Sequence, residues 1–388
     1  MSNTIPESNI SESFYYGDKI NHSYAGDSMN RLNEIYDTDE EDGHQIFPNG
    51  FILDHRYEII ELIGRGTFCL VWMAYDFVAR ENVAIKVLKQ TDYDDVDTEF
   101  ILNKCLSEDM DSNTRLVKFY RIFYHNQRPC LVFELVEHNI LTFLNYFDGQ
   151  YVRLPINLVK KIVKDTLIGL NYMHKHGVIH TDLKPENVMS KRPLFPYRGF
   201  GNAEKIFHPL EDDPNLVDFK LGDIGNSCFI DTPLNDLIQT RQYRAPEVLI
   251  GLPYDTSTDI WSLACMTFEL LTRHHLFDPI IPDEEENSYN KYEFDCIHIS
   301  LIESLLGLFP EDWVLEGSNY DHLYDNNGNL KHHVESDNLS LFDLIVSYGI
   351  LKPDAEEIVT FLEPMLAIIP SQRPSAEELL NSPWLYKI

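Results

Sequence analysis

The chain has 388 residues, of which 44% are hydrophobic, and it carries a formal net charge of −32. This composition can supply a substantial core, and the length allows two or three domains or one bilobal domain. Such an acidic chain is repelled by nucleic acid and by anionic membranes, so we expect it to bind neither directly. The charge alone favours simple solubility slightly over the alternative, a basic partner or substrate.

The N-terminus and the cysteines indicate a reduced intracellular protein. The first residues are polar and lack an apolar signal core. No stretch approaches the roughly 18 apolar residues of a membrane helix. We therefore expect a protein of the cytoplasm and nucleus. We also expect it to be a monomer. No C-x-x-C pair and no His/Cys cluster with zinc spacing occurs among the six cysteines, which are Cys69, Cys105, Cys130, Cys228, Cys265 and Cys296.

Residues 1–50 form an acidic N-terminal segment, rich in Ser, Asn, Asp and Glu, with a charge run at 37–42. Its low apolar content does not repay the entropy cost of ordering, so we expect a largely disordered tail. Four apolar residues near its end are expected to pack onto the domain that follows: Ile46, Phe47, Phe51 and Ile52.

A glycine-containing hairpin comes next. Residues Tyr57–Ile63 alternate in the manner of a strand, and a second strand runs through Trp72 and Tyr75. Gly64 and Gly66 lie between the two strands. Glycines at a hairpin tip let backbone amides approach a phosphate closely, although an ordinary hairpin accounts for them too.

Lys86 lies within the β-branched strand Val83–Leu88. A lysine in such a run is costly to bury unless it is paired or bound to phosphate. Its expected partner is Glu99, in the helical stretch 97–106.

The segment Val178–Asn187 carries the side chains that indicate the function most directly. An amphipathic helix expected at 158–176 leads into it. It offers a carboxylate at Asp182, an ammonium at Lys184 and an amide at Asn187. Transfer of a phosphoryl group needs these three group types, to accept a proton, neutralise charge and hold a metal ion. The alternative is a polar surface turn.

A loop insertion at about 191–216 separates this segment from the strand Phe219–Leu221. Asp223 follows that strand and offers a second carboxylate, and Gly225 permits the backbone to turn. The chain then reads T-R-Q-Y-R-A-P-E over residues 240–247.

These motifs resemble those of protein kinases: H-x-D-x-x-x-x-N, V-A-I-K, D-x-G and A-P-E. The resemblance implies an α+β, bilobal fold over residues 57–385. Its β-rich N-lobe and hinge would span 57–136 and its mostly helical C-lobe 137–385. Four positions depart from the usual pattern: the third glycine is Cys69, the arginine before the catalytic Asp is Thr181, the Phe of D-F-G is Ile224, and Asn103 replaces an apolar residue.

The resemblance also implies roles for individual residues. Asp182, Lys184, Lys86 and Glu99 would be catalytic, and Asn187 and Asp223 would hold Mg²⁺. Glu247, paired with Arg373, and Asp259 would brace the site. Phe133 would be the gatekeeper beside the adenine. The contacts to ATP would come from Ile63, Gly64, Arg65, Gly66, Thr67, Phe68, Cys69, Leu70, Val71, Ala84, Lys86, Phe133, Glu134 and Val136.

Lys184 fits a serine/threonine kinase, and several stretches are similar to SR-protein kinases of the CMGC branch. These are the H-T-D loop, G-N-S-C at 225–228 and I-Q-T-R-Q-Y-R at 238–244. The family implies phosphorylation of serines in arginine/serine-rich proteins, among them splicing factors, and so regulation of mRNA processing. The alternatives are the related LAMMER kinases, whose namesake motif is absent, and a pseudokinase scaffold, which would be expected to have lost a catalytic residue.

An acidic insert at about 279–296 contains Asp283, Glu284, Glu285 and Glu286, followed by Glu293 and Asp295. It lies where the family carries an acidic docking groove, and such a cluster would steer arginine-rich substrates. The alternative is a solvated acidic loop. Because Thr181 cannot pair with a phosphate as arginine does, we also expect activity without phosphorylation of the segment 223–247.

Overall fold

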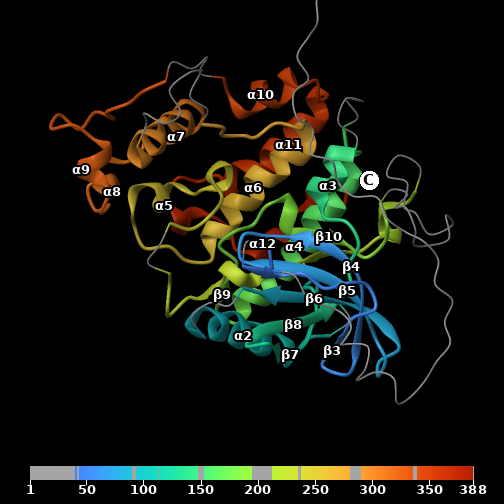
Figure 1. Ribbon diagram of the computed structural model, residues 1–388. Helices are drawn as coiled ribbons and strands as arrows, with labels where there is room; N and C mark the ends of the chain where they lie inside the picture. Colours follow the sequence, from blue (N-terminus) through green and yellow to red (C-terminus); the bar gives the residue numbers. More distant parts are fainter. Residues whose placement is uncertain are drawn as a thin grey trace, which may run out of the picture.

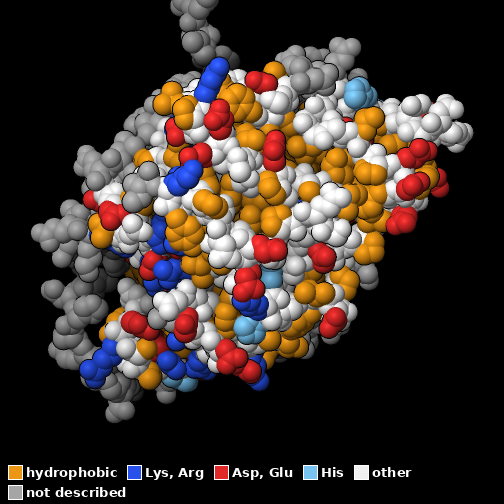
Figure 2. Space-filling model, turned by 180° about the vertical axis from the view of Figure 1, so that it is seen from behind, with side chains coloured by type: hydrophobic (Ala, Val, Ile, Leu, Met, Phe, Trp, Pro, Cys, Tyr) orange, Lys and Arg blue, Asp and Glu red, His pale blue; other side chains and the backbone are white. Residues whose placement is uncertain are grey.

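The computed structural model describes residues 40–41, 43–89, 93–111, 113–146, 153–194, 212–234, 237–279, 290–334 and 339–387. A curled antiparallel sheet forms one lobe and helices form the other (Figure 1). This is the predicted bilobal α+β fold. None of the helices in the described ranges is long and apolar enough to cross a membrane. On the face opposite to that of Figure 1, hydrophobic, acidic and basic side chains are interspersed (Figure 2).

The N-lobe sheet has six strands in the order β3-β4-β5-β6-β8-β7, all antiparallel to their neighbours. Strand β4 extends two residues beyond the predicted Tyr57–Ile63. Successive side chains of each strand point to opposite faces of the sheet, and those on one face form a core that includes Leu53, Ile59 and Ile85. The strands are β3 (Ile52–Leu53), β4 (Tyr57–Arg65), β5 (Cys69–Asp76), β6 (Glu81–Leu88), β7 (Phe119–His125) and β8 (Arg128–Glu134).

The end of the acidic segment packs onto this sheet as predicted. A short hairpin, β1 (Glu40–Glu41) with β2 (His44–Gln45), precedes it. Phe47 and Phe51 are buried and contact each other at a ring distance of 5.2 Å, and Phe47 also lies edge-on to Trp72. The acidic tail before residue 40 lies outside the described residues.

The helix α2 (Tyr93–Ser107) packs beside β7 and carries Glu99 toward the space between the lobes. It begins earlier than the predicted 97–106. Leu102 and Leu106 bury its apolar side. Asn103 is also buried, and its amide donates to the carbonyl of Glu99 at 2.9 Å. The polar residue at an expected apolar position is therefore satisfied within its own helix.

The C-lobe is built around two buried helices, α4 (Ile156–Lys175), predicted at 158–176, and α6 (Ser257–Thr272). Every side chain of α6 from Thr258 to Thr272 is buried, and helices α4 and α11 are among the elements that pack against it. The surrounding helices are α3 (Ile140–Tyr146), α5 (Pro246–Ile250), α7 (Lys291–Leu306), α8 (Glu311–Val314), α9 (Tyr320–Leu323), α10 (Leu341–Ser347), α11 (Lys352–Met365) and α12 (Ala376–Leu379).

Two small strand pairs hold the loops that face the N-lobe. β10 (Val188–Ser190) pairs with β11 (Phe219–Leu221), and β9 (Val178–Ile179) pairs with β12 (Cys228–Phe229). The C-lobe segments that contain Asp182, Asn187 and Asp223 lie on the loops between these strands. The predicted insertion at 191–216 leaves β10 and re-enters through a short 3-10 helix, η3 (Pro214–Leu216), and its central part, 195–211, lies outside the described residues.

Candidate active site

A cavity of about 370 Å³ lies between the lobes. Strands β4, β5 and β6 cover it with Ile63, Val71 and Ala84, and the C-lobe contributes Met189 and Leu221. Phe133, at the end of β8, lines its inner side. The apolar walls and the few polar groups between them suit a flat heteroaromatic ring carrying phosphates.

Most of the predicted nucleotide contacts line this cavity, but three do not. The side chain of Leu70 does not line the cavity, because strand alternation buries it in the N-lobe core at 1% exposure. Thr67 and Phe68 lie at the exposed hairpin tip, away from the cavity wall. The predicted residues that do line it are Ile63, Gly64, Arg65, Gly66, Cys69, Val71, Ala84, Lys86, Phe133, Glu134 and Val136.

Three charged side chains meet at the inner end of the cavity. Lys86 Nζ lies 2.8 Å from Glu99 Oε1 and 3.2 Å from Asp223 Oδ1. Burial alone lowers the pKa of Lys86, but the carboxylates of Asp223 and Glu99 outweigh burial and raise it. The charge of Lys86 in turn lowers the pKa of Asp223. Lys86 is therefore a permanent cation and Asp223 a permanent anion at neutral pH.

The backbone at Asp223 and Gly225 allows these three side chains to approach one another. Asp223 has a φ of 54°, a left-handed conformation that is uncommon for a residue other than glycine. A Cβ at Gly225 would lie 3.1 Å from Lys86 Nζ and 3.3 Å from Glu99 Oε2, too close without a shift of the pair. The glycine predicted for its turning backbone thus also makes room for the ion pair.

Asp259, at the start of α6, holds the catalytic loop in place by accepting hydrogen bonds from two of its backbone N–H groups. Its Oδ2 accepts from the backbone N–H of His180 at 2.8 Å, and its Oδ1 accepts from that of Thr181 at 2.9 Å. His174 Nε2 lies 2.9 Å from the same carboxylate. These bonds fix Thr181 at a φ of 66°, which is strained for a β-branched residue. The bracing expected of Asp259 is present in the geometry.

Thr181 makes a direct link to the segment that follows Asp223. Its Oγ1 donates to the backbone carbonyl of Asn226 at 2.6 Å. This neutral hydrogen bond joins the catalytic loop to the segment 223–247 and requires no phosphate.

Asp182 is surrounded by groups that fix its carboxylate. Lys184 Nζ lies 2.8 Å from its Oδ2, and Thr240 Oγ1 donates to its Oδ1 at 2.7 Å. The Lys184 ammonium also donates to Thr240 Oγ1 at 2.9 Å. Asn187 donates from Nδ2 to the carbonyl of Asp182 at 2.8 Å, which leaves its Oδ1 as a ligand for a cation. Both oxygens of Asp182 are thereby held in place by hydrogen bonds.

No role for Thr240 was predicted from the sequence, although the stretch T-R-Q-Y-R-A-P-E contains it. A threonine has no chemistry that marks it as a site residue, and its partner Asp182 is 58 residues away in sequence. Glu134 likewise does more than was predicted. Burial raises its pKa, but Lys191 and Lys220 outweigh burial and lower it. Its carboxylate also accepts from the backbone N–H of Lys118 at 2.8 Å, so this network ties the end of β8 to β11.

The residues present can hold a divalent cation only together with a ligand. No group of three or more His, Cys, Asp or Glu suited to a metal occurs among the described residues. Asn187 and Asp223 both line the cavity. One amide oxygen and one carboxylate leave the remaining positions to phosphate oxygens and water, which is the coordination that Mg²⁺ prefers in phosphoryl-transfer sites.

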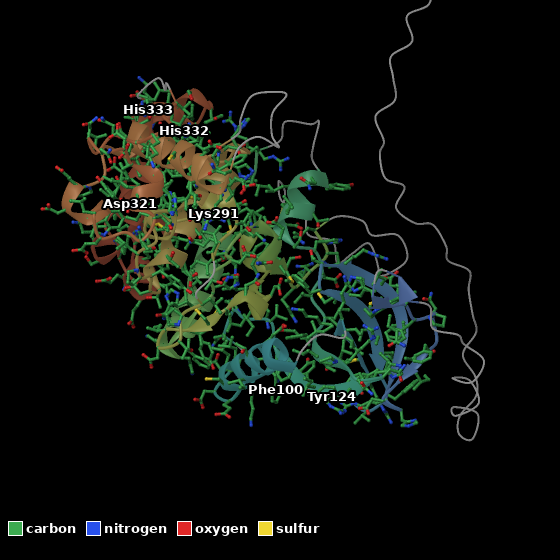
Figure 3. All side chains as sticks on the ribbon, turned by 60° about the vertical axis from the view of Figure 1, so that its left-hand side comes forward. Phe100, Tyr124, Lys291, Asp321, His332 and His333 are labelled. Atoms are coloured by element: carbon green, nitrogen blue, oxygen red, sulfur yellow. The ribbon has the colours of Figure 1, made fainter. Side chains whose placement is uncertain are left out.

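The prediction of an acidic insert at about 279–296 is wrong for the second part of that range. Its second part belongs to helix α7, where Asp295 is fully buried and forms an ion pair with Arg241. Glu293 closes a capping box with Asn290 and lies 3.7 Å from His332 Nε2. Figure 3 shows the start of this helix at Lys291, with His332 in the same part of the C-lobe. These two carboxylates stabilise the fold, and Asp283–Glu286 lie outside the described residues.

Glu247 and Arg373 form the predicted ion pair, with two contacts of 2.7 Å and both side chains fully buried. Arg373 also donates to the carbonyls of Ala367, Ser257 and Ile368 and lies over the ring of Trp261. All of its donors thus face acceptors, as a buried guanidinium requires.

Comparisons with known proteins agree with this geometry. A family model described as the protein kinase domain matches residues 57–385. The chain is 30% identical to "Serine/threonine-protein kinase SRPK" of Physarum polycephalum over 93% of each chain. It is 27% identical to "Protein kinase dsk1" of Schizosaccharomyces pombe, over 95% of this chain and 89% of the relative. It is 24% identical to "SRSF protein kinase 3" of Mus musculus over 87% of each. The chain therefore belongs to the protein kinase family, among the SR-protein kinases, and is an ATP-dependent serine/threonine kinase.

Proposed function

We propose that Asp182 accepts the proton of the substrate hydroxyl while Lys184 neutralises charge on the transferred phosphoryl group. The observation that carries this assignment is the carboxylate of Asp182, oriented on both oxygens by Lys184 and Thr240. A general base must be held within hydrogen-bond reach of the proton that it will accept. Lys184 can contact both Asp182 and the phosphoryl group, since transfer of this kind depends on positioning and electrostatics.

Lys86 would bind the phosphates of ATP, and Glu99 would hold Lys86 in place. Asn187 and Asp223 would hold Mg²⁺, which supplies positive charge to the phosphate oxygens when bound. The nearness of Lys86 to Asp223, 3.2 Å, supports this arrangement, because both groups must face the same phosphates. The complete set of charged residues also argues against a scaffold that has lost catalysis.

The proposed substrates are serines in arginine/serine-rich proteins, including splicing factors, so that the enzyme would regulate mRNA processing. The names of the relatives and the net charge of −32 support a basic substrate. The acidic run Asp283–Glu286 would help to capture such substrates. We propose action on them in both cytoplasm and nucleus, as a monomer.

The test compares two peptides under Mg²⁺-ATP. One carries serine between arginines and the other carries serine among acidic residues, at equal length and concentration. The proposal expects kcat/KM to be higher for the arginine peptide, with a difference that shrinks as salt is added. Equal rates for the two peptides at low salt would contradict the substrate class.

A further inference from the structure

A buried polar cluster joins helix α7 to the segment 238–244. It consists of Asp295 and His298, which lie one helical turn apart on α7, and of Arg244. Their exposed fractions are 0%, 0% and 6%. None of the three side chains lines the nucleotide cavity, so contacts to ATP do not account for them.

Four atoms of this cluster have no hydrogen-bond partner among the described residues. They are Arg244 Nη1, Asp295 Oδ2 and both ring nitrogens of His298. Arg244 Nη1 lies 3.8 Å from Asp295 Oδ1, which is too far for a hydrogen bond, and that oxygen is already paired with Arg241. Unpaired buried polar atoms cost free energy, so native structures pair nearly all of them with protein groups or with ordered water.

These four atoms are matched to the hydrogen bonds of one water molecule. Burial and the charges of Arg241 and Arg244 lower the pKa of His298 well below its usual value, so the neutral ring has one donor and one acceptor. A water molecule can accept from Arg244 Nη1, donate to Asp295 Oδ2 and bond a ring nitrogen of His298, which gives the roughly three hydrogen bonds typical of buried water. An anion would face the carboxylate of Asp295, and a cation would face the guanidinium of Arg244.

Arg244 connects the cluster to the place of reaction. Its Nε donates to the carbonyl of Ile238 at 3.1 Å, and its Nη2 donates to that of Gln239 at 2.8 Å. The next residue is Thr240, whose backbone N–H and hydroxyl donate to Asp182 Oδ1 at 3.2 and 2.7 Å. The orientation of Arg244 therefore fixes the backbone that presents Thr240 to Asp182.

We propose that a buried water molecule joins Arg244, Asp295 and His298, and that His298 is thereby a positioning residue for the carboxylate of Asp182. The water holds Nη1 of Arg244 against α7, which keeps the other two nitrogens of the guanidinium on the carbonyls that precede Thr240. The inference deepens the proposed function and rests on it for the effect on kcat. The water itself and the order of the segment 238–244 do not depend on the role of Asp182 as a base.

The first experiment replaces the ring nitrogens of His298. His298→Leu has an apolar side chain in their place and is expected to lower kcat about three- to thirtyfold, the range of one or two hydrogen bonds. KM for ATP is expected to stay unchanged, because His298 does not line the nucleotide cavity. Hydrogen–deuterium exchange of the amides at 238–245 is expected to become faster than in wild type. His298→Gln keeps a donor and an acceptor, so it is expected to restore most of kcat.

Ile302→Ala is the matched control on the same helix. Ile302 is fully buried on α7, one turn beyond His298. The substitution is expected to lower stability in thermal unfolding and to leave kcat and the exchange at 238–245, relative to the rest of the protein, close to wild type.

The second experiment needs no variant and decides the matter if His298→Leu does not fold. A crystal structure of the wild type, at a resolution that shows ordered water, is expected to contain a water molecule within hydrogen-bond distance of Arg244 Nη1, Asp295 Oδ2 and one ring nitrogen of His298. Direct contacts among the three side chains with no water between them would overturn the proposed bridge.

The remaining outcomes separate this inference from the function on which it rests. Folded His298→Leu with wild-type kcat or with unchanged exchange at 238–245 overturns the positioning role, and so does an equal loss of kcat in Ile302→Ala. Failure of the proposed function would show as turnover by Asp182→Asn at the wild-type rate, with the water and the exchange pattern still as expected.

Discussion

The hydroxyl of Thr181 is expected to maintain activity without phosphorylation. Thr181→Ala removes the 2.6 Å hydrogen bond to the carbonyl of Asn226 and leaves the bonds from Asp259 in place. A neutral intramolecular hydrogen bond contributes about 0.5–1.5 kcal/mol, so the equilibrium constant for ordering the segment is expected to fall about two- to twelvefold, and kcat is expected to fall with it.

The assay is steady-state phosphorylation of an arginine/serine peptide by bacterially expressed protein that has been treated with phosphatase and checked by mass spectrometry. Wild type is expected to be active in this state. Thr181→Ser, which keeps a hydroxyl, is the matched control and is expected to stay within about twofold of wild type, a change smaller than the loss of one hydrogen bond. Wild type that is silent until an upstream kinase phosphorylates it, or Thr181→Ala with full activity, would refute the reasoning.

Three further perturbations test other parts of the site. Lys86→Met is expected to lose nearly all activity, because Asp223 and Glu99 then face each other without the cation between them; full activity in a kinetic assay would remove the phosphate role from Lys86. Arg373→Met leaves Glu247 buried and unpaired, so urea unfolding is expected to show a loss of about 3–5 kcal/mol, whereas breaking the exposed pair of Lys175 with Glu377 costs at most about 1 kcal/mol; equal losses would contradict this account. Replacing Asp283, Glu284, Glu285 and Glu286 with lysine is expected to raise KM for a long arginine/serine substrate and leave KM for ATP unchanged, and an unaltered KM for the long substrate at low salt would show that the run is surface charge only.

Local motifs predicted much of the site, because each one carries its chemistry in adjacent residues. The pair of Lys86 with Glu99 and the bracing by Asp259 are present where the motifs indicated. Strand alternation, applied to the hairpin as a whole, could have indicated that the side chain of Leu70 faces the N-lobe core and not the cavity.

Contacts between residues to which no motif assigns a partner could not be read from the sequence. Asp295 stands among acidic residues in the chain, yet Arg241, 54 residues earlier, buries it in an ion pair. Thr240 acquires its role only because the segment before A-P-E folds back on Asp182. The spatial neighbours of both residues come from tertiary packing, which a linear charge pattern does not encode.

The most direct test of the central claim is Asp182→Asn. The amide cannot accept the proton of the hydroxyl, and it keeps the shape of the carboxylate. With Mg²⁺-ATP and an arginine/serine peptide, we expect phosphopeptide formation measured by mass spectrometry to slow on the order of a hundredfold or more, while nucleotide binding measured by calorimetry is retained. Turnover by Asp182→Asn at the wild-type rate would contradict the assignment of Asp182 as the catalytic base.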